Sequence, residues 1–112
     1  MIWRIRERSA FGRLAANGRR ARAGALWCTA LLDPPGTTSP PRVAFSVGRA
    51  LGTAVVRNRV RRRLRAAVHS VSAAGRMPAG DYLIGARPEA ATQSFADLSA
   101  DLVRVIERVV AT

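Results

Sequence analysis

Six arginines lie within the nine residues from position 57 to position 65 (RNRVRRRLR). A guanidinium group is planar and always charged, and it binds phosphate through paired hydrogen bonds or stacks on a nucleobase. Like charges at this density repel one another along a helix, so a compensating polyanion is expected. Six phosphate contacts would give binding a log–log salt slope of roughly −4 to −5. The segment therefore predicts a surface that binds nucleic acid.

The charge of the whole chain has the same sign and is unevenly placed. The 112 residues carry a net charge of +12, and all 19 basic residues are arginine. Arginine suits RNA binding, although a GC-rich genome would favour it equally. Residues 1–65 hold 15 arginines and two acids, whereas residues 66–112 hold four arginines and five acids. This asymmetry indicates a polyanionic partner, and a hydrophobic content of 48% predicts one folded domain over residues 1–112.

Side chains that could catalyse a reaction are scarce. His69 is the single histidine, Cys28 is the single cysteine, and the seven acids have no metal-ligand spacing. Gly48 and Gly52 fit no phosphate-binding glycine loop. We therefore predict that the chain has neither catalytic residues nor a metal site of its own. The lack of an apolar run of about 20 residues and of a signal-peptide core predicts a cytoplasmic protein that does not contact the membrane.

An amphipathic helix over residues 54–71 is expected to position the arginines. Its apolar side chains fall within one arc at about 100° per residue: Val56, Val60, Leu64, Ala67 and Val71. The side chains that point away from this arc are Asn58, Arg61, Arg62 and Arg65. Arg57 and Arg59 lie at its two edges. The helix should therefore bury one stripe and expose a dense arginine surface.

The remaining segments predict a small α/β domain. A short helix is expected over residues 9–16 with Ser9 as its cap, and a final helix over residues 94–110 with Ser94 and Asp97 as a capping box. Strands are expected over residues 23–32, 42–47 and 82–86, and the first strand region can also be divided into two. Residues 33–41 hold four of the six prolines and are predicted as an exposed hairpin loop. This order implies a two-layer α/β (α+β) sandwich with a small mixed sheet.

Residues 42–65, RVAFSVGRALGTAVVRNRVRRRLR, resemble the signature of the bacterial ribonuclease P protein family. In that family a strand ending in a Ser-Val-type sequence leads through a basic, glycine-containing turn into a helix with Arg-Asn-Arg and then Arg-Arg-Leu-Arg. The resemblance continues at residues 4–6, at Phe11, and over residues 81–88 and 95–102. It implies a ribosomal protein S5 domain 2-like fold of order αβββαβα, in which a left-handed crossover leads from the third strand to the central helix.

The resemblance also implies a function. The chain would be the protein subunit of ribonuclease P, in a one-to-one complex with a catalytic RNA that removes the 5′ leader from precursor tRNA. The endoribonuclease centre would lie in the RNA, with Mg²⁺ held mainly by RNA phosphates, and the protein alone would be inactive.

Two sets of residues are implied to contact RNA. The set expected to bind the catalytic RNA is Arg49, Arg57, Asn58, Arg59, Arg61, Arg62, Arg63 and Arg65. The set expected to line a cleft for the leader is Phe11, Arg13, Trp27, Thr29 and Arg87. For Phe11 and Trp27, packing within the protein is the alternative role.

The sequence departs from the family pattern at three places. Ala15 and Thr29 stand where the family has aromatic residues, and residues 48–50 (Gly-Arg-Ala) have one positive charge fewer than the usual Ser-Lys-Lys-like turn. These departures predict a cleft that depends more on arginine and backbone groups. We expect Arg59→Ala and Arg62→Ala to weaken RNA binding without unfolding the domain.

Three other functions fit less of the sequence. A ribosomal-type RNA-binding protein would share the charge and size. A DNA-binding helix in the major groove would normally mix Asn, Gln and Ser with arginine to read bases. A nuclease made of protein alone would need a cluster of acids, which the sequence lacks.

Overall fold

The helices and strands follow one another along the chain in the order β-α-β-β-β-α-β-α. The computed structural model describes residues 1–111, and Thr112, the last residue of the predicted domain, lies outside them. The strands are β1 (Trp3–Arg4), β2 (Arg19–Ala23), β3 (Leu26–Leu32), β4 (Arg42–Ser46) and β5 (Gly80–Ala86). The helices are α1 (Arg8–Asn17), α2 (Ala54–Ala73) and α3 (Phe95–Val110), with 3₁₀ turns η1 (Arg49–Leu51) and η2 (Pro88–Ala91).

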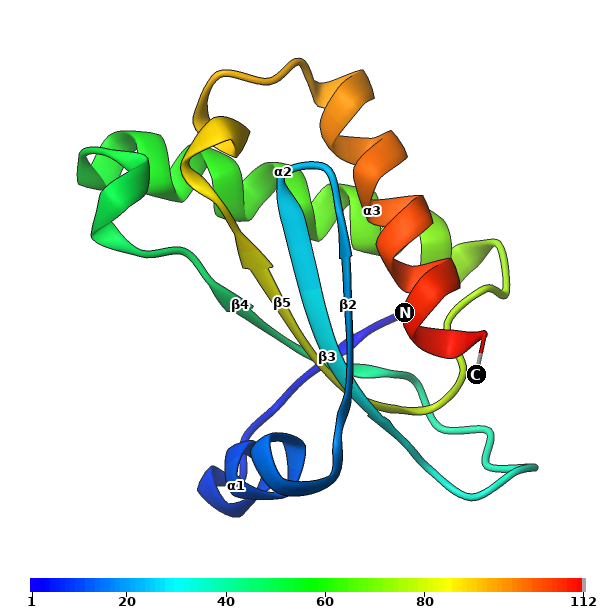
Figure 1. Ribbon diagram of the computed structural model, residues 1–112. Coiled ribbons are helices and arrows are strands. Elements are labelled where there is room, and N and C mark those ends of the chain that lie inside the picture. The colour runs from blue at the N-terminus through cyan, green and yellow to red at the C-terminus, as the bar shows by residue number, and fades with distance from the viewer. Residues whose placement is uncertain (112) are drawn as a thin grey trace.

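The strands form one mixed sheet in the order β1-β4-β5-β3-β2 (Figure 1). β3 pairs antiparallel with β2 and β5, whereas β4 pairs parallel with β5 and with β1. β5 therefore lies between β3 and β4. The prediction of a hairpin loop over residues 33–41 is wrong, because β5 comes later in the chain and pairs with both strands that this loop connects.

The region predicted as a first strand over residues 23–32 is divided into β2 and β3. Ala23 pairs with Leu26, which leaves a turn of two residues, and Gly24 in this turn has φ of +54°. Glycine at the first of two turn positions is typical of a type II′ hairpin turn, because other residues rarely adopt a positive φ. The division follows from this glycine.

The ends of the helices confirm one predicted cap and correct another. The Ser94 hydroxyl accepts a hydrogen bond from the Asp97 N–H at 3.1 Å and caps α3 as predicted. The predicted cap at Ser9 is wrong, because α1 begins at Arg8 after Glu7, which makes no side-chain cap. Ser9 accepts a hydrogen bond from Arg13 at 3.1 Å instead. The two-residue strand β1 was not predicted, although arginines alternate with apolar residues there.

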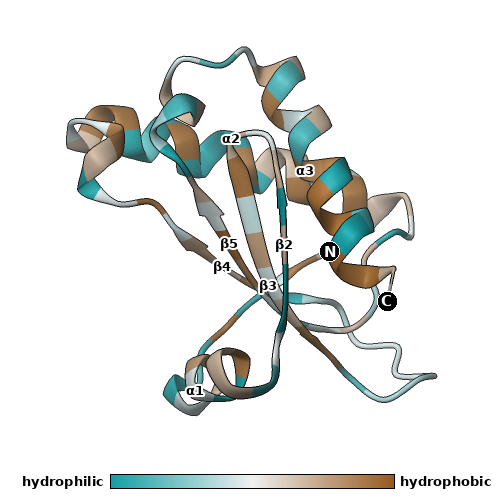
Figure 2. Cartoon of the chain, viewed as in Figure 1, coloured by the Kyte–Doolittle hydropathy of each residue, from teal (hydrophilic) through white to brown (hydrophobic). Residues whose placement is uncertain are grey.

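α2 and α3 cover one face of the sheet and enclose the main core. Alternate residues of β3 and β5 point into it, and Cys28, Tyr82 and Ile84 are fully buried there. The helices contribute the fully buried side chains of Leu64, Val68, Leu98, Leu102 and Val105. The apolar and polar bands along α3 in Figure 2 reflect this one-sided burial. Burial raises the pKa of the Cys28 thiol to about 12, as expected for a small apolar core residue.

α1 packs against the opposite face of the sheet and forms a second, smaller core. Ala10 and Leu14 are its two buried residues, and they pack with Ile5 against apolar side chains of the strands. These strand residues are Leu31, Ala44 and Leu83. The helix therefore covers one part of this face and leaves the rest without a helical layer (Figure 1).

Arg42 connects the base of the loop over residues 33–41 to the sheet. Its Nε donates a hydrogen bond to Asp81 at 2.7 Å, and a terminal nitrogen donates to Asp33 at 2.8 Å. The two carboxylates raise the pKa of the Arg42 guanidinium and neutralise its charge locally. Arg42 is thus a structural residue whose charge is balanced by acids within the fold.

Asp101 on α3 fixes the turn between β2 and β3. Its buried carboxylate accepts hydrogen bonds from the Ala25 N–H at 3.1 Å and from Gln93 at 2.8 Å, and it pairs with Arg104. A Cβ on Gly24 would lie only 2.2 Å from the same carboxylate. Glycine is therefore required at this position for its conformation and for its size.

We predict that Asp101→Ala lowers the free energy of unfolding by about 1–3 kcal/mol, because the buried Ala25 N–H loses its acceptor. Urea unfolding followed by circular dichroism measures the change. Glu107→Ala on the same helix removes an exposed acid and should change stability by less than about 0.5 kcal/mol. Equal effects of the two substitutions would contradict the role assigned to Asp101.

Candidate nucleic-acid interface

α2 presents its arginines because its apolar stripe is held against the sheet. The helix begins after Thr53, whose hydroxyl accepts a hydrogen bond from the Val56 N–H at 3.4 Å. The buried stripe is Val60, Leu64, Ala67, Val68 and Val71. On the opposite side of the helix Asn58, Arg62, Arg65 and His69 are exposed. This arrangement confirms the predicted amphipathic helix.

Three of the arginines in the set expected to bind the catalytic RNA also hold neighbouring loops. Arg59 donates a hydrogen bond to the Ala91 carbonyl and Arg63 donates to the Gln93 carbonyl, each at 3.1 Å. Arg61 donates to the Val47 carbonyl at 3.4 Å. All three side chains are half-buried, so Arg61, predicted to point away from the apolar arc, is less exposed than Arg62 and Arg65. A guanidinium has five N–H donors, so each of these groups keeps donors for a phosphate.

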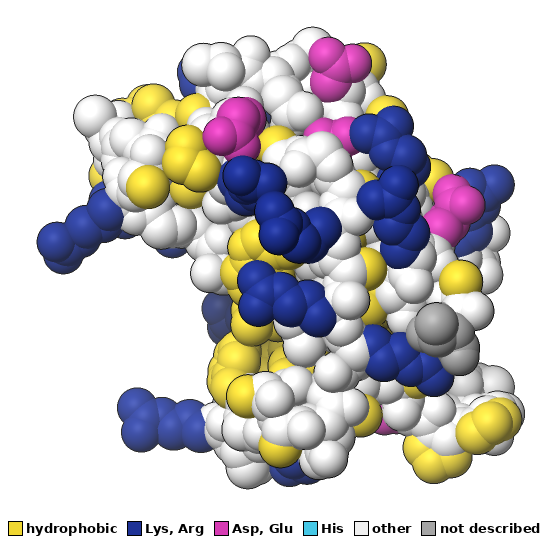
Figure 3. Space-filling view, in the orientation of Figure 1, with side chains coloured by type: hydrophobic (Ala, Val, Ile, Leu, Met, Phe, Trp, Pro, Cys, Tyr) yellow, Lys and Arg dark blue, Asp and Glu magenta, His cyan; other side chains and the backbone are white. Residues whose placement is uncertain are grey.

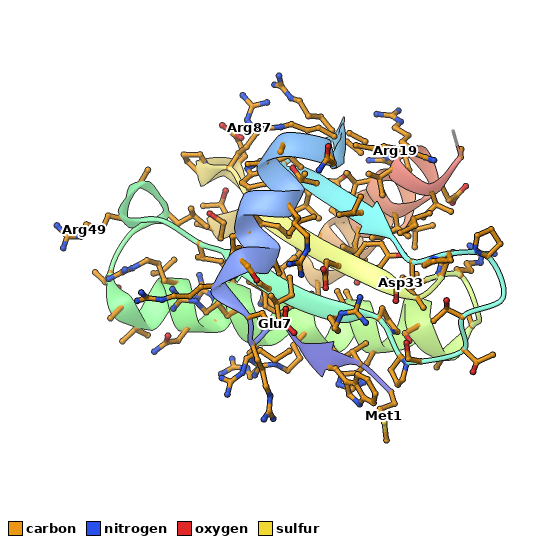
Figure 4. The ribbon with its side chains drawn as sticks, turned by 90° about the horizontal axis from the view of Figure 1, so that it is seen from below. Met1, Glu7, Arg19, Asp33, Arg49 and Arg87 are labelled. Atoms are coloured by element: carbon orange, nitrogen blue, oxygen red, sulfur yellow. The ribbon has the colours of Figure 1, made fainter. Side chains whose placement is uncertain are left out.

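The arginines of α2 have no acidic partners among residues 1–111. Among residues 1–111, the ion pairs involve Arg13, Arg42, Arg87 and Arg104, and none involves an arginine of α2. The Nε of half-buried Arg57 has no hydrogen-bond partner. Arg49 on η1 is exposed and extends away from the molecule at the end opposite Asp33 (Figure 4). The resulting positive potential is uncompensated and attracts a polyanion.

The sheet face that carries α1 remains partly open. On this face Trp27 of β3 pairs with Gly85 of β5, which in turn pairs with Ser46 of β4. Thr29 lies in the next row, and a Cβ added to Gly18 at the end of α1 would lie 2.7 Å from its methyl group. Thr29 is therefore half-buried beneath the end of the helix, whereas the row of Trp27 continues beyond it. Figure 3 shows this side of the molecule hollowed, with apolar and arginine side chains along the hollow.

Trp27 lies flat across the sheet under an arginine that sequence reasoning did not select. A Cβ on Gly85 would lie 1.9 Å from the indole, so the ring occupies the space that a larger residue would fill. The guanidinium carbon of Arg20 lies 4.7 Å from the centre of the ring, within the range of a cation–π contact. Arg20 of β2 pairs with Thr29 and so faces the same side. Only the division of residues 19–32 into two strands reveals this arrangement.

The other three residues of the predicted leader cleft do not lie together. Arg13 pairs with Glu7 at 3.4 Å and lines a groove with Arg42 and Asp81. Phe11 is two positions earlier and therefore lies on nearly the opposite flank of the helix, where it is 41% exposed. Arg87 follows β5 and pairs with Glu89 at 3.6 Å. The structure thus brings Trp27 and Thr29 onto one face and turns Arg13 away from them.

Acidic and thiol side chains do not gather into a metal site. Within residues 1–111, no group of three or more His, Cys, Asp or Glu side chains is arranged to hold a metal ion. No helix in the same range is long and apolar enough to cross a membrane. The groups available for recognition on these surfaces are guanidinium, indole and backbone groups.

Arg59 and Arg62 should differ in their effect on stability. We predict that Arg59→Ala lowers the free energy of unfolding by about 1 kcal/mol, because the Ala91 carbonyl loses its donor. Arg62→Ala removes an exposed side chain and should change it by less than about 0.5 kcal/mol. Thermal and urea unfolding of both variants measure the difference. If Arg62→Ala proved the more destabilising, the division of these arginines into bonded and free would be wrong.

Comparisons with known proteins agree with this fold. The family model described as ribonuclease P matches residues 2–110. The ribonuclease P protein component of Thermobifida fusca is 40% identical, and the match covers 95% of this chain and 75% of the relative. That of Nocardioides sp. is also 40% identical, covering 95% of this chain and 90% of the relative.

Solved structures show the same fold at lower identity. The Staphylococcus aureus RNase P protein has a TM-score of 0.80 at 21% identity and covers 96% of this chain and 95% of that chain. The Thermotoga maritima RNase P protein has a TM-score of 0.79 at 21% identity and covers 95% and 96%. These structures confirm the predicted α/β fold, and the family match confirms the resemblance noted in the sequence. The chain therefore belongs to the ribonuclease P protein family.

Proposed function

We propose that this chain acts as the protein subunit of ribonuclease P, binding the catalytic RNA and the 5′ leader of precursor tRNA in a one-to-one cytoplasmic complex. The observation that carries the proposal is an arginine helix with no acidic partners among residues 1–111, on a sheet whose opposite face is partly open. The complex is an endoribonuclease, and the protein contributes binding and positioning. Among residues 1–111, the lack of a cluster of acids, histidines or cysteines that could hold a metal ion supports a catalytic centre in the RNA.

The exposed side of α2 would bind the catalytic RNA. Phosphate contacts fix the orientation of a protein on nucleic acid, and arginine makes them most effectively where it is not already neutralised. Arg62 and Arg65 are exposed and have no acidic partner in the described part of the chain, and Arg49 extends the same charge beyond the start of the helix. Arg59, Arg61 and Arg63 would bind phosphate with the donors that their carbonyl contacts leave free. This set favours a structured, highly charged RNA over a base-reading contact.

The open sheet face would bind the single-stranded leader. Unpaired bases stack on aromatic rings and on guanidinium planes, and this contact tolerates any sequence. Trp27 and the Arg20 above it offer such a surface. The family has an aromatic residue at the position of Thr29, two residues from Trp27. Phe11 is exposed on the flank of α1 away from Arg13, which suits a second stacking contact. Arg87 would then contribute charge beside the face, whereas Arg13, predicted for the same cleft, pairs with Glu7 on the other flank of α1.

Mg²⁺ would be bound mainly by phosphates of the RNA. Mg²⁺ prefers oxygen ligands in octahedral geometry and usually keeps several waters, which RNA phosphates satisfy. The carboxylates of Asp33, Asp81 and Asp101 are engaged by arginines within the fold. The chain would therefore assist metal-dependent hydrolysis by positioning the substrate and screening its charge.

Cleavage of precursor tRNA tests the proposal directly. A bacterial ribonuclease P RNA is incubated with precursor tRNA at low millimolar Mg²⁺, with and without this protein. We expect cleavage at the mature 5′ end to be restored by the protein, while the protein alone cleaves nothing. A protein that binds RNAs indiscriminately and leaves this RNA inactive would instead support a ribosomal-type role.

The leader surface makes a separate prediction. Trp27→Ala should weaken binding of precursor tRNA to the holoenzyme by about 1–3 kcal/mol, since a stacked base loses its platform. Arg20→Ala should act in the same direction. Mature tRNA lacks the leader, so its affinity should not change in either variant, and Trp27→Phe should retain most of the preference. Equal losses for precursor and mature tRNA would show that the sheet face does not hold the leader.

A further inference from the structure

The row of Trp27 crosses the open sheet face from the side of α2 to the opposite edge of the sheet. Ser46 of β4 pairs with Gly85 of β5, Gly85 pairs with Trp27 of β3, and Trp27 pairs with Arg22 of β2. The loop that directly follows Ser46 accepts a hydrogen bond from Arg61 on α2. β2 is the last strand of the sheet on the other side. The row therefore begins beside the arginine helix and ends at a free strand edge.

This row is short relative to a strand of RNA. Neighbouring strands lie about 4.8 Å apart, so the three spacings from β4 to β2 span about 14 Å. A stacked nucleic-acid strand advances about 3.4 Å per nucleotide, so the row holds about four nucleotides, and fewer where the RNA is extended. A longer single strand that follows the row must therefore continue over the edge at β2.

Two arginines flank that edge from the two faces of the sheet. Arg22 pairs with Trp27, so its side chain lies on the open face. Its carbonyl points away from β3 and accepts a hydrogen bond from Arg108 of α3, which packs on the opposite face of β2 and β3. In Figure 4 α3 lies at the side of the sheet away from α2. The charged group of Arg108 therefore lies at the free edge, close to the backbone of Arg22.

Both guanidinium groups are available to an anion. Arg22 and Arg108 are exposed, and neither forms an ion pair with an acid of residues 1–111. The contact of Arg108 with the neutral Arg22 carbonyl uses one of five N–H donors and leaves its charge uncompensated. Guanidinium groups at these two positions are suited to bind successive phosphates of a strand that crosses the edge.

We infer that the edge formed by Arg22 and Arg108 binds phosphates of the 5′-distal part of the leader, beyond the nucleotides on the open face. The inference rests on the proposed function, which assigns the catalytic RNA to α2 and the leader to the open face. The catalytic RNA holds the cleavage site, so the leader enters the row from β4 and its 5′ part leaves over β2. Phosphate contacts carry no sequence information, so the edge recognises the length of a leader.

Affinities for a short and a long leader test the inference. The holoenzyme is assembled with the catalytic RNA and binds a precursor tRNA with a leader of about three nucleotides, which ends before β2, or one with a leader several times longer. Arg22→Ala and Arg108→Ala should each weaken binding of the long leader by about 2- to 5-fold, the contribution of one exposed ion pair, and leave the short leader unchanged. Equal losses for both leaders would overturn the inference.

Two further substitutions serve as controls. Arg108→Lys keeps the positive charge and should retain most of the preference for the long leader. Arg76→Ala removes the same charge from an exposed position in the loop after α2 and should affect neither leader. Thermal unfolding checks that every variant stays folded. If Arg76→Ala weakened the long leader as much as Arg108→Ala does, the effect would come from net charge and the edge would not be a binding site.

The salt dependence of binding counts the contacts. Each phosphate contact with a single strand contributes about 0.7 to the log–log slope, so the long leader should have a slope steeper than that of the short leader by about 1.4. Arg22→Ala and Arg108→Ala should each remove about half of this difference. A slope that does not change with leader length would contradict phosphate contacts at the edge.

Cross-linking measures where the leader lies. The single cysteine of the chain, Cys28, is buried, so Arg108→Cys adds the one exposed thiol and accepts a photoreactive label. We expect this label to cross-link to nucleotides in the 5′ half of the long leader, and a label on Arg76→Cys to give no cross-link to the leader. Cross-links from position 108 to nucleotides beside the cleavage site would overturn the inference.

The inference and the proposed function fail in distinguishable ways. If Arg22→Ala and Arg108→Ala bind both leaders as the unsubstituted protein does, while Trp27→Ala weakens the long one, the distal contact is wrong and the leader face stands. The arginines would then serve to keep the exposed edge from pairing with a second chain. If Trp27→Ala also changes neither affinity, the leader face fails and the inference loses its basis with it.

Discussion

The parallel pairing of β4 with β5 determines where the arginine helix lies. Parallel neighbours in a sheet cannot be joined by a tight turn, so the chain must cross over the sheet in a dozen or more residues. α2 occupies that connection, and its 20 residues run along the same face that α3 covers. One stripe of α2 must therefore be apolar and buried, and the opposite stripe must face solvent. The helix that completes the sheet is thus also the helix that carries the charge.

The arginines of α2 repel one another, and backbone carbonyls offset part of this repulsion. Acidic partners would relieve the repulsion but would also cancel the attraction for RNA. Arg59, Arg61 and Arg63 instead donate to the carbonyls of Ala91, Val47 and Gln93, which are neutral groups with a partial negative charge. These contacts fix η2 and the loop before η1 against α2 while the net charge stays unchanged. Acids are paired with arginine elsewhere, as Asp33 and Asp81 are with Arg42, where charge serves the fold alone.

The sequence predicted most elements of the fold because their signals are local. The apolar arc of α2, the Ser94 cap and the strand predicted over residues 82–86, observed as β5, each depend on residues close by in the chain. The position of β5 between β3 and β4 was not predictable in this way, since pairing between distant strands leaves no local pattern. The same reason explains why Arg20 was missed. Its significance comes from the register of β2 against β3, which places it over Trp27, and no spacing within the sequence shows that contact.

The short length of α1 is what leaves part of this sheet face open. The helix has 10 residues, and only Ala10 and Leu14 are buried, so it covers Leu31, Ala44 and Leu83 and ends above Thr29. Trp27 is left to cover the neighbouring row by itself, and it lies flat there because residue 85 is glycine. A larger residue at position 85 would lift the indole and close the open face to a base. The open face therefore depends on the lack of a side chain at Gly85 and on the lack of a helical layer beyond the end of α1.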